Sequence, residues 1–168
     1  MDSVRHFPVT TTALLVFALL AQGCASNPSP GTAPRSTLSR GNALKLAKMV
    51  AANVGGEAYI IAPTGSMRPT LDESSVVTIE HVAFARLQAG DIVIYRSAAG
   101  SAVIHRLYER HGESWFVLGD NNSSVDREPV TGENLLGRVC AIFYSAAGDR
   151  SASSRSSPPD LMAVAEVN

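Results

Sequence analysis

The sequence predicts a mainly-β domain that begins with one α-helix. Its central apolar residues occur in short runs rich in Val, Ile and Tyr, and Gly, Pro or Asn residues separate these runs. One earlier segment instead repeats its apolar residues at helical spacing. Segments rich in Ser, Ala and Pro lie on both sides, so we expect the folded unit to cover about residues 41–145. That length is enough to bury a small core.

The first 24 residues are typical of an export signal. A basic start at Arg5 precedes an apolar run over residues 13–21. This run is too short to cross about 30 Å of hydrocarbon comfortably. It leads into LAQGC at residues 20–24, which resembles the lipobox of bacterial lipoproteins, although Ala21 stands where Leu is more usual. Cys24 is therefore the expected lipidation site, and a plain secretory signal that contains a cysteine is the alternative.

Low-complexity segments flank the expected folded unit. Residues 25–40 (ASNPSPGTAPRSTLSR) predict a flexible spacer between a membrane and the domain. Residues 146–168 are rich in Ser and Ala and predict a disordered tail. A lipid on Cys24 implies a position in the bacterial cell envelope, on the periplasmic or outer side of a membrane. Ala25, in the place of an Asp, points to the outer membrane.

Residues 41–54 carry the helical pattern. Apolar residues recur at a spacing of three or four, and Gly55-Gly56 ends the run. The positions expected to face the core are Leu44, Ala47, Val50 and Val54.

The strands are expected where β-branched and aromatic residues gather. Each run is bounded by turn-forming residues, and the close spacing of the runs is typical of a mainly-β domain. The runs cover residues 59–61, 76–79, 91–95, 102–108, 115–118 and 138–144.

Charge and cysteine usage exclude several classes of protein. The chain has 14 Lys and Arg residues against 15 Asp and Glu residues, so we expect no nucleic-acid partner. Cys24 and Cys140 cannot form a disulfide scaffold, and neither has zinc-ligand spacing with the four histidines. We therefore expect no metal and no cofactor. Cys140 lies in an apolar run and is expected to be buried, whereas His81 and His111 are expected to be exposed.

Three polar clusters lie near the ends of the expected strands. Ser66 follows Gly65 in a turn bounded by prolines, and His105 interrupts an apolar run. Asp120 and Asp126 lie in the segment GDNNSSVD. Serine, histidine and aspartate are the parts of a nucleophile, a base and a group that orients the base. Each cluster also has a simpler interpretation: a turn-forming serine, a satisfied core histidine and an ordinary hairpin turn.

Five motifs in sequence order resemble the signal peptidase I and LexA-like serine peptidase superfamily. The resemblance covers about residues 57–145 and implies a coiled, barrel-like β-sheet. The motifs are GSMRPTL at 65–71, GDIVIY at 90–95, IHRL at 104–107, GDNN at 119–122 and GRV at 137–139.

The distribution of lysines selects a branch of this superfamily. Most bacterial relatives use a lysine base, but this chain has no lysine after Lys48. His105 occupies the position of that lysine. The chain therefore resembles the histidine branch, which includes the signal peptidases of the endoplasmic reticulum, of archaea and of some Gram-positive spore formers.

The resemblance implies a role for each site residue. Ser66 is the expected nucleophile and His105 the expected general base. Asp126 is expected to orient His105, and Asp120 to hold its turn or to share that task. The backbone N–H of Ser66 and the hydroxyl of Thr64 are the expected oxyanion donors.

The resemblance and the signal together predict a membrane-tethered serine endopeptidase. Its expected partners are exported or membrane-associated protein substrates, cut after small residues. One alternative is a non-catalytic envelope lipoprotein that uses the same fold as a binding module. A cytoplasmic autoproteolytic regulator is a third hypothesis, and it requires that residues 1–24 are not an export signal.

Overall fold

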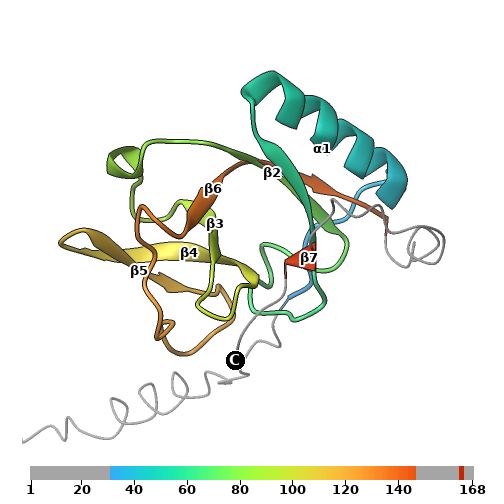
Figure 1. The fold of residues 1–168 in the computed structure, drawn as a ribbon. Coiled ribbons are helices and arrows are strands. Elements are labelled where there is room, and N and C mark those ends of the chain that lie inside the picture. The colour runs from blue at the N-terminus through green and yellow to red at the C-terminus, as the bar shows by residue number, and fades with distance from the viewer. Residues whose placement is uncertain (1–30, 147–162, 165–168) are drawn as a thin grey trace, which may run out of the picture.

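In the part of the chain that the structure describes, one curled β-sheet and a single α-helix make up the fold (Figure 1). The computed structural model describes residues 31–146 and 163–164 of the 168-residue chain. Seven strands form the sheet in the order β5-β4-β3-β6-β2-β1-β7. Neighbouring strands are antiparallel, except that β1 and β7 are parallel. The predicted mainly-β fold with one amino-terminal helix is confirmed.

The elements follow the predicted order along the chain. All six apolar runs overlap a strand, and only the last strand was not expected. The bounds are α1 Arg40–Val54, β1 Glu57–Ile61, β2 Ser75–Glu80, the 3₁₀ helix η1 Phe84–Arg86, β3 Ile92–Arg96, β4 Ala102–His111, β5 Ser114–Leu118, β6 Leu135–Tyr144 and β7 Ala163–Val164.

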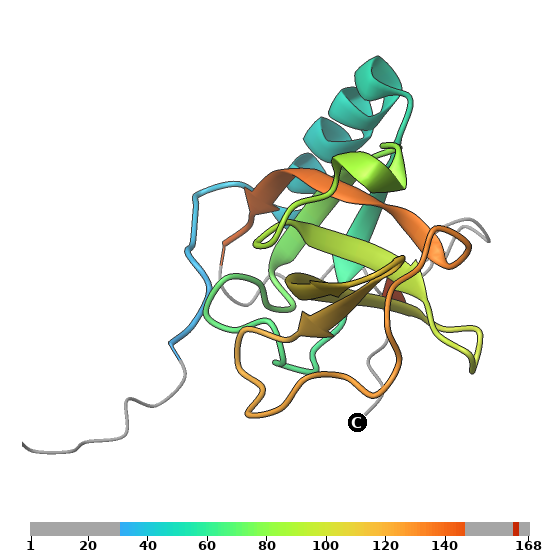
Figure 2. The same cartoon turned by 90° about the vertical axis from the view of Figure 1, so that its left-hand side faces the viewer.

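Curvature brings distant strands of the sheet together (Figures 1 and 2). β1 and β4 are separated by three strands in the sheet order, yet Ile61 of β1 and Ile104 of β4 belong to one buried cluster. Met67, which follows β1, packs in the same cluster. The registers of β2 and β3 both shift where they pair with β6, and such irregularities increase local twist. The sheet therefore closes around a core to which β1 and β4 both contribute.

Local signals at both ends define α1. The side chain of Ser39 accepts a hydrogen bond from the backbone N–H of Asn42 at 3.2 Å, which caps the first turn. Gly55 ends the helix in the left-handed conformation at φ 66°, which glycine adopts at little cost. The predicted helix is confirmed, with its start one residue earlier.

The buried face of α1 differs in part from the expected one. The buried residues are Ala43, Ala47 and Ala51, and the carbonyl of Ala47 accepts a hydrogen bond from the Thr78 hydroxyl at 2.9 Å. A stripe of small side chains allows the helix to lie close to β2 at this point. The expectation for Ala47 is confirmed, whereas the one for Val54 is wrong, because that side chain is 42% exposed.

Three expectations about single side chains have clear outcomes. His81 and His111 are exposed, as predicted. Cys140 is also exposed, so its predicted burial is wrong. The cause is a register shift between β2 and β6: Ile79 pairs with Val139 and Thr78 with Ala141, so Cys140 is the extra residue of β6 between them. Within residues 31–146 and 163–164, no helix has the length and apolar character needed to cross a bilayer.

The expected spacer and tail differ from the structure where the chain is described. Ala33 is only 2% exposed, and the Ser36 hydroxyl donates to the carbonyl of Tyr144 at 2.5 Å. Residues 33–36 therefore lie against the domain and do not form a free spacer. In the expected tail, Ala163–Val164 form β7. Residues 1–30, 147–162 and 165–168, which include the signal and Cys24, lie outside the described residues.

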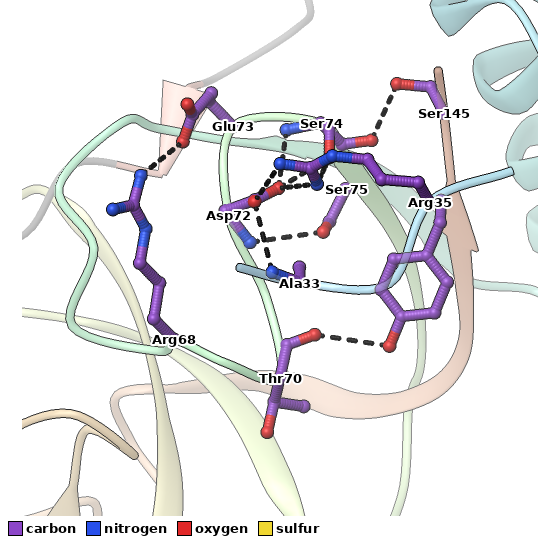
Figure 3. Close-up of polar contacts among 10 residues, drawn as sticks. Ala33, Arg35, Arg68, Thr70, Asp72, Glu73, Ser74, Ser75 and Ser145 are labelled. Atoms are coloured by element: carbon purple, nitrogen blue, oxygen red, sulfur yellow. Dashed lines mark hydrogen bonds and ion pairs between the residues drawn. The ribbon is translucent and has the colours of Figure 1, made fainter. Parts of the chain in front are cut away.

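A buried carboxylate attaches residues 33–36, the amino-terminal arm, to the loop between β1 and β2 (Figure 3). Asp72 is 1% exposed and forms an ion pair with Arg35 at 2.8 Å. It also accepts hydrogen bonds from the backbone N–H groups of Ala33 at 3.3 Å and Ser74 at 2.9 Å. Burial by itself raises the pKa of Asp72, but the hydrogen bonds from Arg35 and Ser74 outweigh burial and lower the pKa to about 2.

This pKa predicts how stability depends on pH. The lowered pKa stabilises the fold above about pH 4, and that contribution is lost as the pH falls towards 2. The change from 3.8 to about 2 corresponds to about 2 kcal/mol. Urea unfolding between pH 2 and pH 5 should show this loss in the parent and in the control Glu113→Gln, but not in Asp72→Asn. Equal pH dependence in Asp72→Asn and the parent would contradict the assignment.

Candidate active site

A turn after β1 presents Ser66. Gly65 has φ 86°, a conformation that favours glycine and that turns the chain just before the serine. The next residue, Met67, and Leu71 are buried in the core, so the turn is fixed at its base. Ser66 itself is only 7% exposed. The hydroxyl therefore lies at the edge of the core with a restricted orientation.

His105 lies in the middle of β4 and is completely buried. Its Nε2 atom lies 2.9 Å from the Ser66 hydroxyl oxygen. Its Nδ1 atom lies 2.5 Å from a carboxylate oxygen of Asp126. A carboxylate only accepts hydrogen bonds, so Nδ1 carries the proton and Nε2 is left to accept from the serine. This is the tautomer in which an imidazole can take a proton from the hydroxyl.

Asp126 comes from the loop that follows β5. Its backbone N–H donates to the carbonyl of Val117 at 2.9 Å, which fixes the loop to that strand. The carboxylate oxygen that faces His105 also accepts a hydrogen bond from the Tyr95 hydroxyl at 2.7 Å. Burial and the neighbouring Asp126 both raise the pKa of Tyr95, so its hydroxyl keeps its proton and remains a donor.

Tyr95 is the residue that sequence reasoning missed. It ends the GDIVIY motif, but a tyrosine in an apolar strand gives no local signal of a polar partner. The contact exists because the pairing of β3 with β4 places Tyr95 opposite Val103, two residues before His105 on the same strand.

The two aspartates of the GDNNSSVD segment have different surroundings. Asp120 receives two hydrogen bonds from the Arg106 guanidinium, at 2.7 and 2.6 Å, and one from the Thr70 hydroxyl at 2.5 Å. Burial raises its pKa, but these hydrogen bonds outweigh burial, and the pKa lies below its usual range. Asp120 therefore links its own loop to β4 and to the loop between β1 and β2 that carries Ser66, called here the serine loop. Asp126, in contrast, is the carboxylate in hydrogen-bond contact with His105.

The 119–126 loop also lies directly against the serine turn. The backbone N–H of Asn121 donates to the carbonyl of Ser66 at 2.6 Å, and its side-chain amide donates to the carbonyl of Gly65 at 3.1 Å. A Cβ atom at Gly119 would lie 2.9 Å from that same Ser66 oxygen. Only glycine permits so close an approach of the two backbones.

A cleft of about 680 Å³ opens at these side chains. Ser66, His105 and Asp126 line it together with Tyr95 and residues 121–128. The expected oxyanion donor Thr64 is exposed in the turn before Ser66. Among the residues that the structure describes, no group of three or more His, Cys, Asp or Glu side chains is placed to hold a metal ion. The arrangement can move a proton from a hydroxyl to an imidazole.

Comparison with known proteins finds a similarity to a signal peptidase. The chain is 30% identical over 92 residues to signal peptidase I W of Bacillus subtilis (strain 168), an alignment that covers 48% of each chain. The chain thus spans about half the length of this relative. The similarity supports a relationship to the signal peptidase I family. No protein-family model matches the chain.

The contact between Tyr95 and Asp126 predicts a measurable effect on Ser66. Tyr95→Phe removes a donor from the carboxylate that holds His105, a bond to a charged group worth about 2 kcal/mol. Covalent labelling of Ser66 by a fluorophosphonate should slow by up to about 30-fold, the rate factor that corresponds to about 2 kcal/mol, and thermal stability should fall because the same bond contributes to the folded state. Tyr108→Phe is the control, because Tyr108 is 58% exposed and does not line the cleft. Equal labelling rates in all three proteins would remove Tyr95 from the site.

Proposed function

We propose that the protein is a signal-peptidase-like serine endopeptidase. The observation that carries this proposal is the continuous chain of hydrogen bonds from Ser66 through His105 to Asp126 in an open cleft. The similarity to signal peptidase I W supports the same class of reaction. Three residues from different parts of the sequence converge at this point, which a purely structural serine or histidine does not require.

In the proposed reaction, Ser66 attacks a peptide carbonyl carbon while its proton passes to Nε2 of His105. The negative charge that develops on the carbonyl oxygen is stabilised by the backbone N–H of Ser66 and the hydroxyl of Thr64. Collapse of this intermediate breaks the C–N bond, and His105 returns the proton to the leaving amine. Water then cleaves the acyl-enzyme with His105 again as the base. Asp126 keeps Nδ1 protonated and the ring oriented throughout.

His105 is a better candidate for the general base than either lysine of the chain. Both lysines, Lys45 and Lys48, lie on α1 and are exposed. His105 is buried and already in contact with the hydroxyl. We therefore assign the protein to the histidine branch of the superfamily as part of the proposal.

We also propose that the reaction takes place at a membrane surface of the cell envelope. Similarity to a signal peptidase suggests an exported or membrane-associated protein. A lipid on Cys24 would tether the enzyme at the membrane surface of the cell envelope. Tethering raises the effective concentration of enzyme towards membrane-bound segments. The proposed substrates are therefore exported or membrane-associated proteins.

Loss of the proposed nucleophile or base should abolish cleavage. Ser66→Ala and His105→Ala should each lower kcat/KM by about 10⁴-fold or more on a peptide with small residues before the scissile bond. Lys45→Ala and Lys48→Ala are matched controls and should cleave at the parental rate. Full cleavage by either site variant would overturn the assigned pair. A properly folded parent that cleaves no peptide would favour a non-catalytic binding module.

The proposed tether has its own test. Cells that express the full chain and are fed an alkyne-labelled fatty acid should incorporate the label in the parent and not in Cys24→Ser. Cys140→Ser is the control for labelling at the other cysteine and should label like the parent. Equal labelling of Cys24→Ser and the parent would exclude lipid attachment at Cys24.

A further inference from the structure

The last strand of the sheet comes from the carboxyl-terminal part of the chain. Ala163 and Val164 form β7, which pairs in parallel with Ile60 and Ile61 of β1. β7 is the outermost strand on that side of the sheet. Without it, the Ile60–Ile61 part of this edge would present unpaired N–H and C=O groups, and such an edge is a template for pairing with another extended segment.

The covered edge lies next to the candidate active site. β1 ends at Ile61, and the chain reaches Ser66 five residues later. β7 also contacts β4, the strand that carries His105 (Figure 1). β7 therefore lies between the strand that leads to the nucleophile and the strand that carries the base.

The direction of β7 matters as much as its position. Because the pairing is parallel, β7 runs in the same direction as β1, whose chain continues to the Ser66 turn. An extended segment advances about 3.3 Å per residue along such an edge. A peptide that pairs with β1 in this way is aimed along the sheet edge that leads to the serine.

We propose that β7 is an intramolecular occupant of the peptide-docking edge of this site, and that a substrate has to displace it. Addition of a strand to an exposed edge is a general mode of peptide recognition, in which main-chain hydrogen bonds supply affinity. The inference rests on the proposed peptidase function only where it names a substrate as the peptide that competes with β7. The pairing of β7 with β1 stands on the geometry.

Because β7 belongs to the same chain as β1, even a weak pairing between them can keep the edge occupied. Sixteen residues, 147–162, join the domain to β7. Attachment of this length gives an effective concentration on the order of 1 mM. If the pairing has an intrinsic dissociation constant of about 0.1 mM, the edge is then occupied most of the time. A free peptide would bind about tenfold more weakly than to an open edge.

The decisive experiment measures binding in the full chain with Ser66→Ala, so that no cleavage occurs. Val164→Pro removes an N–H and prevents regular strand pairing, whereas Ser154→Pro makes the same change elsewhere in the tail. The probe is a fluorescein-labelled peptide with the sequence of residues 161–166, LMAVAE, and fluorescence anisotropy gives its Kd. We expect about tenfold tighter binding to Val164→Pro than to either Ser154→Pro or the unmodified tail.

Equal affinity in the three proteins would overturn the proposal. Hydrogen exchange provides a second measurement, because the backbone amides at and next to Ile60 and Ile61, where β7 pairs with β1, should exchange faster in Val164→Pro than in Ser154→Pro. Unchanged exchange would also overturn it. Peptide affinity and hydrogen exchange are both measured without catalysis. A failure of this proposal can therefore be distinguished from a failure of the proposed function, which Ser66-dependent cleavage tests. In the active enzyme, Val164→Pro should lower KM at unchanged kcat.

Discussion

The site depends on a buried imidazole whose two nitrogens both need partners. His105 is fully buried in β4, where an unsatisfied ring nitrogen would be costly. One partner comes from the turn after β1 and the other from the loop after β5. The histidine thus joins two loops that are far apart in sequence, and the same contacts that satisfy its burial create the arrangement that general base catalysis requires.

Several other interactions hold those two loops in place. The 119–126 loop lies against the serine turn through the backbone of Asn121, at a distance that only Gly119 allows. Asp120 links the same loop to Arg106 and Thr70. Farther along the serine loop, Asp72 fixes it to the amino-terminal arm. Paired charges and close backbone contacts therefore surround the site, which is consistent with a preorganised geometry.

Two described segments, residues 33–36 and β7, also contact this region. β1 and β4 share a core although three strands separate them in the sheet. The edge of β1 that faces away from β2 is therefore close to β4, and β7 covers part of it. The amino-terminal arm contacts Asp72 in the loop between β1 and β2. Segments that precede and follow the domain thus both contact elements next to Ser66.

The sequence by itself determined the local features: the helix between Ser39 and Gly55, six strand-forming runs, and the candidate residues Ser66 and His105. These follow from residue spacing and turn chemistry within short windows, and the absence of later lysines restricted the choice of base. Tertiary structure decided which aspartate faces His105, the contact of Tyr95, the alanine face of α1, the exposure of Cys140 and the pairing of β7. Each of these depends on strand register and sheet curvature, which join residues distant in sequence and leave no signal in any one segment.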